Sequence, residues 1–179
     1  FIEELLKENN CKVSDLDAVA VSSGPGSFTG LRIGVSTAKG LCYAADLPLI
    51  AVSTLQALAA GAKSKIPGAD VYCPMIDARR MEMYRALFDK NGSPLSDPEA
   101  TIIDEDFLSG TSGKIVLSGD GAAKCKSVLT DPKFLFAESL SSAADMISIA
   151  EQKFNAGEIE NTGLFEPFYL KGFVPGGQR

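Results

Sequence analysis

Histidine is absent from this sequence of 179 residues, and tryptophan is absent as well. Without histidine, the chain offers no Ser-His-Asp or Cys-His catalytic pair, no histidine general base and no histidine ligand for zinc or iron. The four cysteines are widely scattered and form no C-x-x-C pair. This spacing argues against a disulfide framework and a zinc knuckle, so we expect reduced core cysteines at Cys11, Cys42, Cys73 and Cys125.

Long apolar runs are also missing, since none approaches the roughly 20 residues that a membrane-spanning helix needs. The chain does not start with a signal-peptide pattern, and we expect a cytoplasmic protein with no membrane partner. Basic residues are outnumbered, with 17 Lys and Arg against 23 Asp and Glu and a formal charge of −6. This balance disfavours direct binding to nucleic acid, because that affinity depends on basic side chains that displace counterions. Any contact with nucleic acid is therefore expected to require a partner.

The first third of the chain alternates helices with strands. Residues 1–9 have the spacing of an amphipathic helix. Residues 16–23 form an apolar run typical of a strand covered on both faces, and residues 48–53 predict a second buried strand. A helix that begins near Thr29 separates the two strands, and a capping-box sequence at 53–56 starts another helix. This alternation predicts that the two strands are parallel.

A polar break at residues 63–70, which contains Pro67-Gly68, suggests a boundary between two lobes. We predict an N-terminal lobe at 1–66, a C-terminal lobe at 67–162 and a tail at 163–179. Within the second lobe, residues 71–78, 82–89 and 100–103 suit an antiparallel three-strand meander. The elements expected after it are a short helix at 104–108, a strand at 114–118, a helix from Ala122, a strand at 133–137 and a helix at 141–155 closed by Gly157.

The two lobes repeat one another in their order of elements. Residues 23–26, SGPG, follow a strand in the first lobe, and residues 118–121, SGDG, follow the matching strand in the second. A β-β-β-α-β-α-β-α unit used twice is the layout of the actin/Hsp70/sugar-kinase superfold. We therefore expect an α/β protein with two ribonuclease-H-like lobes facing a cleft, the first lacking its N-terminal three strands in this chain.

A glycine-rich loop joins the first strand to the following helix. It lacks the Gly-Lys-Ser/Thr of a Walker A loop, and its glycines are spaced too widely for a dinucleotide fingerprint. One interpretation is an anion site at the helix N-terminus with Arg32 nearby. The interpretation we favour is conformational, with Thr29 capping the helix. The residues of the loop are Gly24, Pro25, Gly26, Ser27, Phe28, Thr29 and Gly30.

The helix after this loop is apolar on two faces. One set of residues has the spacing of a core-facing stripe: Leu31, Val35, Ala38, Cys42 and Ala45. A second set on a different face is also apolar or small: Ile33, Thr37, Gly40, Leu41 and Ala44. Either the helix is sandwiched within its own lobe, or its outer face meets a partner.

The segment at residues 75–84 places Asp77, Arg79, Arg80 and Glu82 around a tight connection. An acid/base pair is conceivable there, but carboxylates next to arginines are usually ion-paired and held ionised. The acidic residues between 97 and 106 resemble a solvated face rather than a metal cage. We therefore predict no catalytic residue, no metal and no cofactor.

Three segments resemble the bacterial TsaB family, also called YeaZ and formerly labelled M22 glycoprotease homologues. They are SSGPGSFTGLRIGVSTAKGLCYAADLPLIAVSTLQALA at 22–59, MIDARRMEMYRALF at 75–88 and EPFYLKGF at 166–173. The resemblance implies a protein needed for the threonylcarbamoyl modification of adenosine beside the tRNA anticodon.

Members of that family are noncatalytic relatives of the subunit TsaD. The resemblance implies that the chain binds TsaD, that the ATPase TsaE joins them, and that the chain self-associates through the same surface when alone. It assigns the contact helices to residues 1–9, with Leu5, and to the helix with Ile33, Thr37, Gly40, Leu41 and Ala44. Two rivals remain open: an M22-type peptidase or small-molecule kinase of the same superfold, and a direct tRNA binder.

Overall fold

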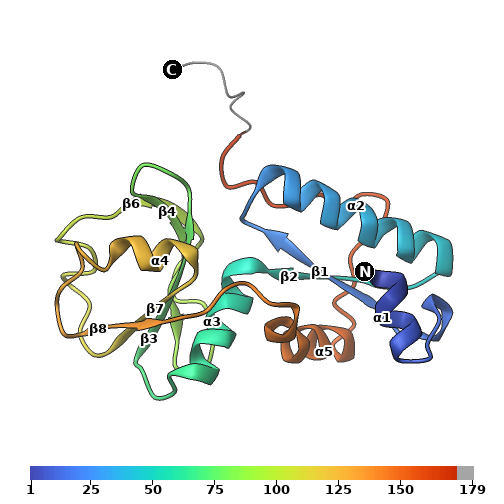
Figure 1. Cartoon of the computed structure of the whole chain (residues 1–179), viewed down its shortest axis with the longest axis horizontal. Coiled ribbons are helices and arrows are strands. Elements are labelled where there is room, and N and C mark those ends of the chain that lie inside the picture. Colours follow the sequence, from blue (N-terminus) through green and yellow to red (C-terminus); the bar gives the residue numbers. More distant parts are fainter. Residues whose placement is uncertain (173–179) are drawn as a thin grey trace.

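Two separate β-sheets organise residues 1–172, the part of the chain that the structure, a computed structural model, describes (Figure 1). The helices are α1 (Ile2–Glu8), α2 (Phe28–Ala45), α3 (Thr54–Lys65), α4 (Asp120–Cys125) and α5 (Ile147–Asn155), with 3-10 turns η1 (Val13–Asp15) and η2 (Ala143–Met146). The strands are β1 (Val19–Gly24), β2 (Leu49–Ser53), β3 (Val71–Asp77), β4 (Glu82–Arg85), β5 (Phe88–Asp89), β6 (Glu99–Ile102), β7 (Ile115–Ser118) and β8 (Phe134–Ala137). Residues 173–179, which include the end of the predicted tail, lie outside the described part.

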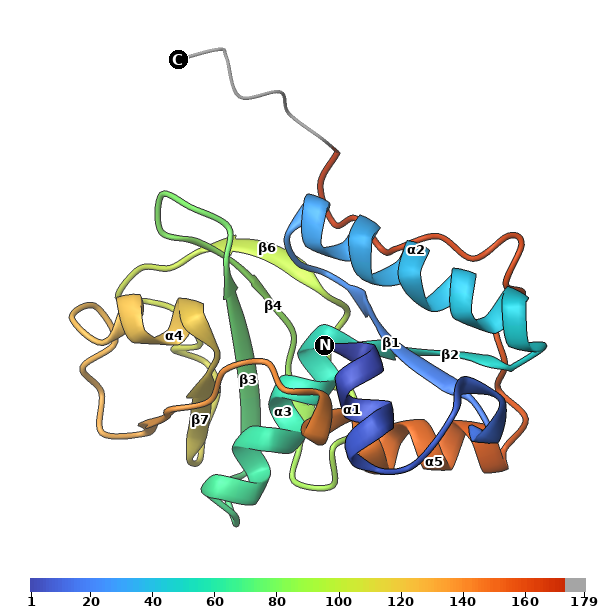
Figure 2. The same ribbon diagram turned by 45° about the vertical axis from the view of Figure 1, so that its right-hand side comes forward.

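The first sheet consists of β1 and β2, which run parallel as predicted. Side chains alternate across β2, so that Leu49 packs beneath α2 and Ile50 packs against α5 on the other face. Figure 2 shows α2 and α5 on opposite sides of this sheet. The prediction of a strand covered on both faces at 16–23 is wrong in part. β1 begins at Val19, Ala20 is exposed, and within the described residues only one edge of β1 carries a neighbouring strand.

The second sheet has six strands in the order β6-β4-β3-β7-β8, with β5 also paired to β3. β3, β4 and β6 form the predicted antiparallel meander, whereas β7 and β8 run parallel to β3. The register of β3 is the same against β4 and β5, since Met75 pairs with Arg85 and Tyr72 with Phe88. The pairing is interrupted between them beside Pro74, which has no N–H to donate.

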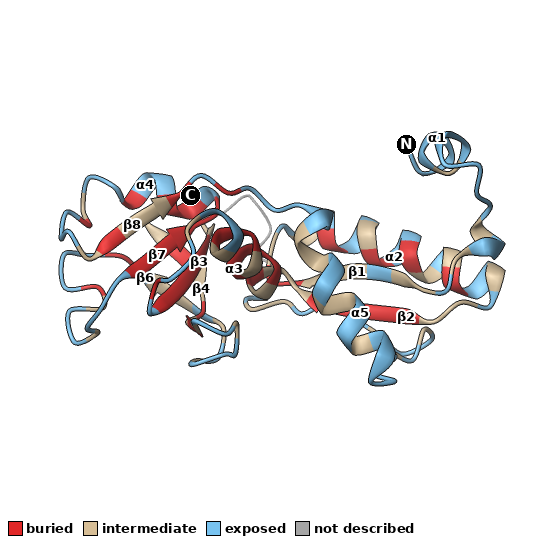
Figure 3. Ribbon diagram, turned by 90° about the horizontal axis from the view of Figure 1, so that it is seen from below, coloured by how far each residue is buried: buried red, intermediate tan, exposed pale blue. Residues whose placement is uncertain are grey.

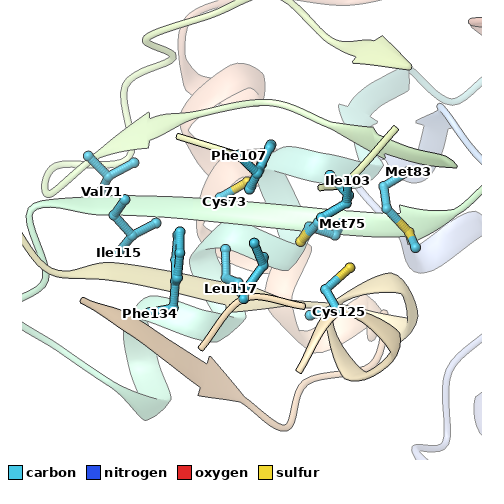
Figure 4. Packing of buried hydrophobic residues seen from close by; sticks show 12 residues of the cluster. Val71, Cys73, Met75, Met83, Ile103, Phe107, Ile115, Leu117, Cys125 and Phe134 are labelled. Atoms are coloured by element: carbon cyan, nitrogen blue, oxygen red, sulfur yellow. The ribbon is translucent and has the colours of Figure 1, made fainter. Parts of the chain in front are cut away.

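The two faces of the second sheet bury different clusters. Val71, Cys73 and Met75 of β3 point to the face covered by α4 and by the loop around Phe107 (Figure 4). Tyr72 points to the opposite face and packs against α3. This alternation follows from the two-residue period of a strand and explains why β3 is apolar at nearly every position.

Helices α3 and α5 each pack against strands of the sheet other than the one that precedes them in the chain. α3 follows β2 of the first sheet, but its residues Leu55 and Ala62 pack with Tyr72 of the second. α5 follows the second sheet, but Ile149 packs with Ile50 of the first. The predicted boundary at 66/67 remains a prediction, and the packing of both helices crosses it.

Four further local predictions differ from the structure. Residues 82–89, expected as one strand, divide into β4 and β5, and the helix expected from Ala122 begins at Asp120. Residues 104–108, expected as a short helix, form turns, although Phe107 is still buried in the core. The helix expected at 141–155 divides into η2 and α5. No helix within residues 1–172 is long and apolar enough to cross a membrane.

Candidate partner-binding surface

The inner face of α2 is built as the sequence predicts. Leu31, Val35, Ala38 and Cys42 are buried, three to four residues apart, and face β1 and β2. The helix begins at Phe28, one residue before the predicted start near Thr29, and its N-cap is Ser27, whose Oγ accepts from the N–H of Gly30 at 3.4 Å. Thr29, the predicted cap, lies inside the first turn and is exposed.

The outer face of α2 is apolar and open to solvent. Ile33 is 64% exposed, and Thr37, Gly40 and Ala44 are exposed along the same stripe. Leu41 lies on a flank and is half-buried. The helix is therefore not sandwiched within the described part of its lobe, and the other alternative left open by the sequence, an outer face that meets a partner, stays a prediction.

Tyr43 belongs to the same open surface, although the sequence analysis did not single it out. Its side chain is 89% exposed and lies one residue before Ala44 on the flank of the outer face. An exposed aromatic side chain beside a stripe of small residues is typical of protein interfaces. Its position in the helix could have identified it, because it falls outside the core-facing spacing.

Leu5 lies on α1, a helix in which no residue is buried. Its side chain is 53% exposed, and Phe1 and Ile2 are exposed beside it. Figure 3 shows α1 projecting from the rest of the molecule, in the pale colour of exposed residues. The structure thus does not join Leu5 to the stripe on α2, and it leaves a second unpaired apolar helix face.

The glycine-rich loop borders a cavity of about 380 Å³ between the two lobes. Ser22, Gly26, Ser27, Thr54, Asp120 and Leu140 are among its lining residues. The hydroxyls of Ser22 and Thr54 are hydrogen-bonded to each other at 2.5 Å. Arg32 does not line this cavity; its guanidinium lies 4.8 Å from the ring of Phe28 on the flank of α2. Among residues 1–172, Asp120 is the one charged residue that lines the cavity, which disfavours an anion there.

The two glycine motifs that suggested an internal repeat share a backbone geometry. Gly24 has φ +111° and Gly119 has φ +92°, a region that glycine adopts without strain. A Cβ on Gly24 would lie 2.4 Å from the carbonyl oxygen of Phe168, and one on Gly119 would lie 2.4 Å from that of Met75. Both glycines therefore serve close backbone approach, which supports the conformational interpretation of the loop.

Asp77 is held ionised, as predicted, chiefly by Lys124 and with a smaller contribution from the neighbouring Arg79. Its carboxylate accepts from the ammonium of Lys124 and from the main-chain N–H of Arg79. These contacts, the lysine first, hold the pKa of Asp77 below its usual range. Glu82 pairs instead with Lys171. A carboxylate held in this way is a poor general base near neutral pH.

Three of the four cysteines are buried thiols, and Cys11 is exposed, which corrects the prediction of four core residues. Burial raises the pKa of Cys73 to about 12. Among residues 1–172, no group of three or more His, Cys, Asp or Glu side chains is arranged to hold a metal ion.

Comparison with known proteins places these features in a family. The family model described as TsaD, tRNA N6-adenosine threonylcarbamoyltransferase, matches residues 1–156. The tRNA threonylcarbamoyladenosine biosynthesis protein TsaB of Escherichia coli K12 is 34% identical over 97% of this chain and 79% of its own length. TsaB of Bacillus subtilis 168 is 41% identical over 51% of this chain and 39% of its own length.

The solved structures agree with the sequence relatives. YeaZ from Pseudomonas aeruginosa superposes with a TM-score of 0.81 at 29% identity, over 94% of this chain and 81% of that one. The two sheets, the packing of α3 and α5 across them and the glycine-rich loop are thus the actin-like fold that the element order predicted. The chain belongs to the TsaB (YeaZ) family.

Proposed function

We propose that this chain is a noncatalytic subunit in the biosynthesis of threonylcarbamoyladenosine in tRNA. In this proposal it binds a TsaD protein through the outer face of α2, and TsaE joins the pair. The tRNA is contacted only through the complex, in the cytoplasm. Relatives of 34% and 41% identity that carry the name of this pathway support the proposal.

The open stripe on α2 is the observation that carries the proposal. Ile33, Thr37, Gly40 and Ala44 recur every three to four residues, as in a helix that packs against another helix. A Cβ built on Gly40 meets no atom of residues 1–172 within 4 Å, which leaves space above it for a neighbouring backbone. Small residues allow two helices to approach closely, and the exposed Ile33 and Tyr43 supply apolar area at the edges. The same surface suits a homodimer when TsaD is absent.

The chemistry of the cavity between the lobes supports a noncatalytic role. Two of its hydroxyls, those of Ser22 and Thr54, bond to each other rather than to a base. Asp120 accepts from the main-chain N–H of Asp77 at 3.0 Å, and Asp77 itself is paired with Lys124. No pair of these groups combines a nucleophile with a base that could activate it.

Reconstitution tests the proposal. The chain is copurified with TsaD and TsaE, and modification of tRNA is measured with each protein omitted in turn. We expect a TsaD complex, and loss of modification without this chain. Turnover of peptide or a small-molecule phosphoryl acceptor by the isolated chain, abolished by Asp77→Asn or Ser27→Ala, would instead support the peptidase or kinase. Steep salt-dependent retention of tRNA by the lone chain would support the direct tRNA binder.

A further inference from the structure

The C-terminal strap, residues 160–172, is a connection between the lobes that the sequence analysis did not anticipate. The chain passes between the two sheets at the start of α3 and again between β8 and η2. The strap leaves α5, runs along α2 and ends beside β4 of the second sheet (Figures 1 and 2). The strap therefore connects the two lobes a third time. It is part of the chain at the first lobe and reaches the second lobe only through noncovalent contacts.

The first half of the strap is anchored on the first lobe. The N–H of Glu160 donates to the carbonyl of Leu49 at 2.9 Å. The ammonium of Lys39 donates to the carbonyls of Gly163 and Phe165 at 3.3 and 2.9 Å. Phe165 packs into the core beneath α2. This part of the strap is held by several hydrogen bonds and by the partly buried Phe165, and does not depend on a single contact.

The strap next touches the end of β1 and the start of α2. The N–H of Phe168 donates to the carbonyl of Ser23 at 2.7 Å, and the approach is possible because Gly24 has no side chain there. The ring of Tyr169 lies 4.7 Å from that of Phe28. These contacts place the strap against the glycine-rich loop that borders the cavity.

Three residues beyond Phe168, the strap reaches the second lobe. The ammonium of Lys171 lies 2.5 and 2.6 Å from the two carboxylate oxygens of Glu82, the first residue of β4. The Glu82 side chain is mostly covered and the Lys171 side chain is half-exposed. Between Phe168 and Lys171 the strap thus spans both lobes.

We propose that the strap is a releasable brace, which fixes the angle between the lobes through the Lys171–Glu82 ion pair. Two chain crossings and the packing of α3 against both sheets join the lobes, and the Lys171–Glu82 pair adds a restraint at the far end of the strap. An ion pair of this exposure changes an equilibrium by a factor of up to about five. The brace is therefore weak enough to open when a partner or salt competes for either charge.

Exchange and distance measurements on the full chain test the brace. The variants are Lys171→Glu, Glu82→Lys and the double swap, which restores the opposite charges. We expect each single variant to accelerate amide exchange at Phe168 about two- to fivefold. It should also broaden the distance between spin labels at Ser36→Cys and Ser112→Cys, two exposed positions in different lobes, in a Cys11→Ser background. The double swap should restore both readouts.

Lys7→Glu is the matched control, because Lys7 pairs with Glu3 on α1 at 3.0 Å, far from the strap in sequence. It should leave both readouts unchanged. Amide protection of β4 and β6 reports whether Glu82→Lys perturbs the second sheet. Lys171→Glu tests the brace with no substitution in that sheet. Unchanged exchange and distances in Lys171→Glu, or no recovery in the double swap, would overturn the proposal. Neither readout needs TsaD, so this outcome is independent of the proposed function.

Discussion

Ala38 and Gly40 lie two residues apart on α2 but on opposite sides of the helix. Ala38 is 5% exposed and packs with Cys42 and Leu49, whereas a Cβ on Gly40 would meet no atom of the described part of the chain within 4 Å. Two residues correspond to slightly more than half a turn of a 3.6-residue helix, which accounts for the contrast. The inner side of α2 therefore contributes to folding, and its outer side is available for association.

Gly40→Leu should weaken binding to TsaD and self-association without unfolding the chain. The leucine fills the space that a close-packed partner helix would need, and we expect a Kd about tenfold higher, or ~1.4 kcal/mol. Helix stability should rise slightly, since leucine is a better helix former than glycine. Titration calorimetry and sedimentation measure the association.

Gly110→Leu is the control for this variant, because a Cβ on Gly110 also meets no atom within 4 Å and the residue lies in a loop of the second lobe. It should bind normally. Equal affinities for the two variants would mean that the outer face of α2 is not the contact surface.

Ala38→Glu should destabilise the fold itself. A glutamate at this position places a charge among the apolar side chains of Cys42, Leu49 and Phe165, at a cost of about 3 kcal/mol. Thr37 is the preceding residue and is exposed, so Thr37→Glu should change the free energy of unfolding by less than ~0.5 kcal/mol. Urea denaturation compares the two variants. Similar midpoints for both would contradict the assignment of Ala38 to the buried face of α2 and Thr37 to the exposed face.

Asp77→Asn should lower stability near neutral pH but not in acid. Because the folded-state pKa of Asp77 lies below its unfolded value of 3.8, the stabilisation is fully present above that value and is lost as pH falls through the folded pKa. Asp77 is partly exposed, so we expect only about 0.5 kcal/mol at neutral pH. Asp97→Asn, an exposed aspartate, serves as the control in pH-dependent urea titrations. If the stability difference between the unmodified chain and Asp77→Asn persists at the lowest pH, the ion pair with Lys124 is not its cause.

A thiol reagent should modify one cysteine per folded chain. Cys11 is exposed, whereas burial raises the pKa of Cys42, Cys73 and Cys125 and so removes reactive thiolate. Absorbance after addition of an aromatic disulfide counts the fast-reacting thiols. Cys11→Ser should abolish the fast phase, and a remaining fast phase would show that a core cysteine is accessible.

Ser118→Ala and Ser139→Ala should be neutral or stabilising by up to about 1 kcal/mol. Both hydroxyls are buried and have no hydrogen-bond partner within residues 1–172, so their removal relieves an unsatisfied group. Ser22→Ala should instead cost about 1 kcal/mol, because it removes the bond to Thr54. Thermal unfolding of the three variants ranks their stabilities. If Ser118→Ala destabilises the protein as much as Ser22→Ala, the Ser118 hydroxyl has a hydrogen-bond partner after all.

Local sequence predicted most of the elements but not all of their ends. The apolar spacing at 31–45 identified the buried stripe of α2, and the capping box at Ser53 identified the start of α3. The cap of α2 was assigned to Thr29 rather than Ser27, because both residues have capping hydroxyls and the sequence does not rank them. Residues 104–108 have helix-compatible composition, yet they form turns that carry Phe107 into the core.

The sequence by itself determined the alternation of strands and helices, the parallel pairing of β1 with β2 and the two apolar faces of α2, because these follow from periodicity within one segment. Only the tertiary structure decided which sheet α3 and α5 cover, that the outer face of α2 stays open, and that the strap joins Ser23 to Glu82. Periodicity reveals that a face is apolar, but not which distant surface covers it. That choice depends on shape and on contacts between residues far apart in the chain.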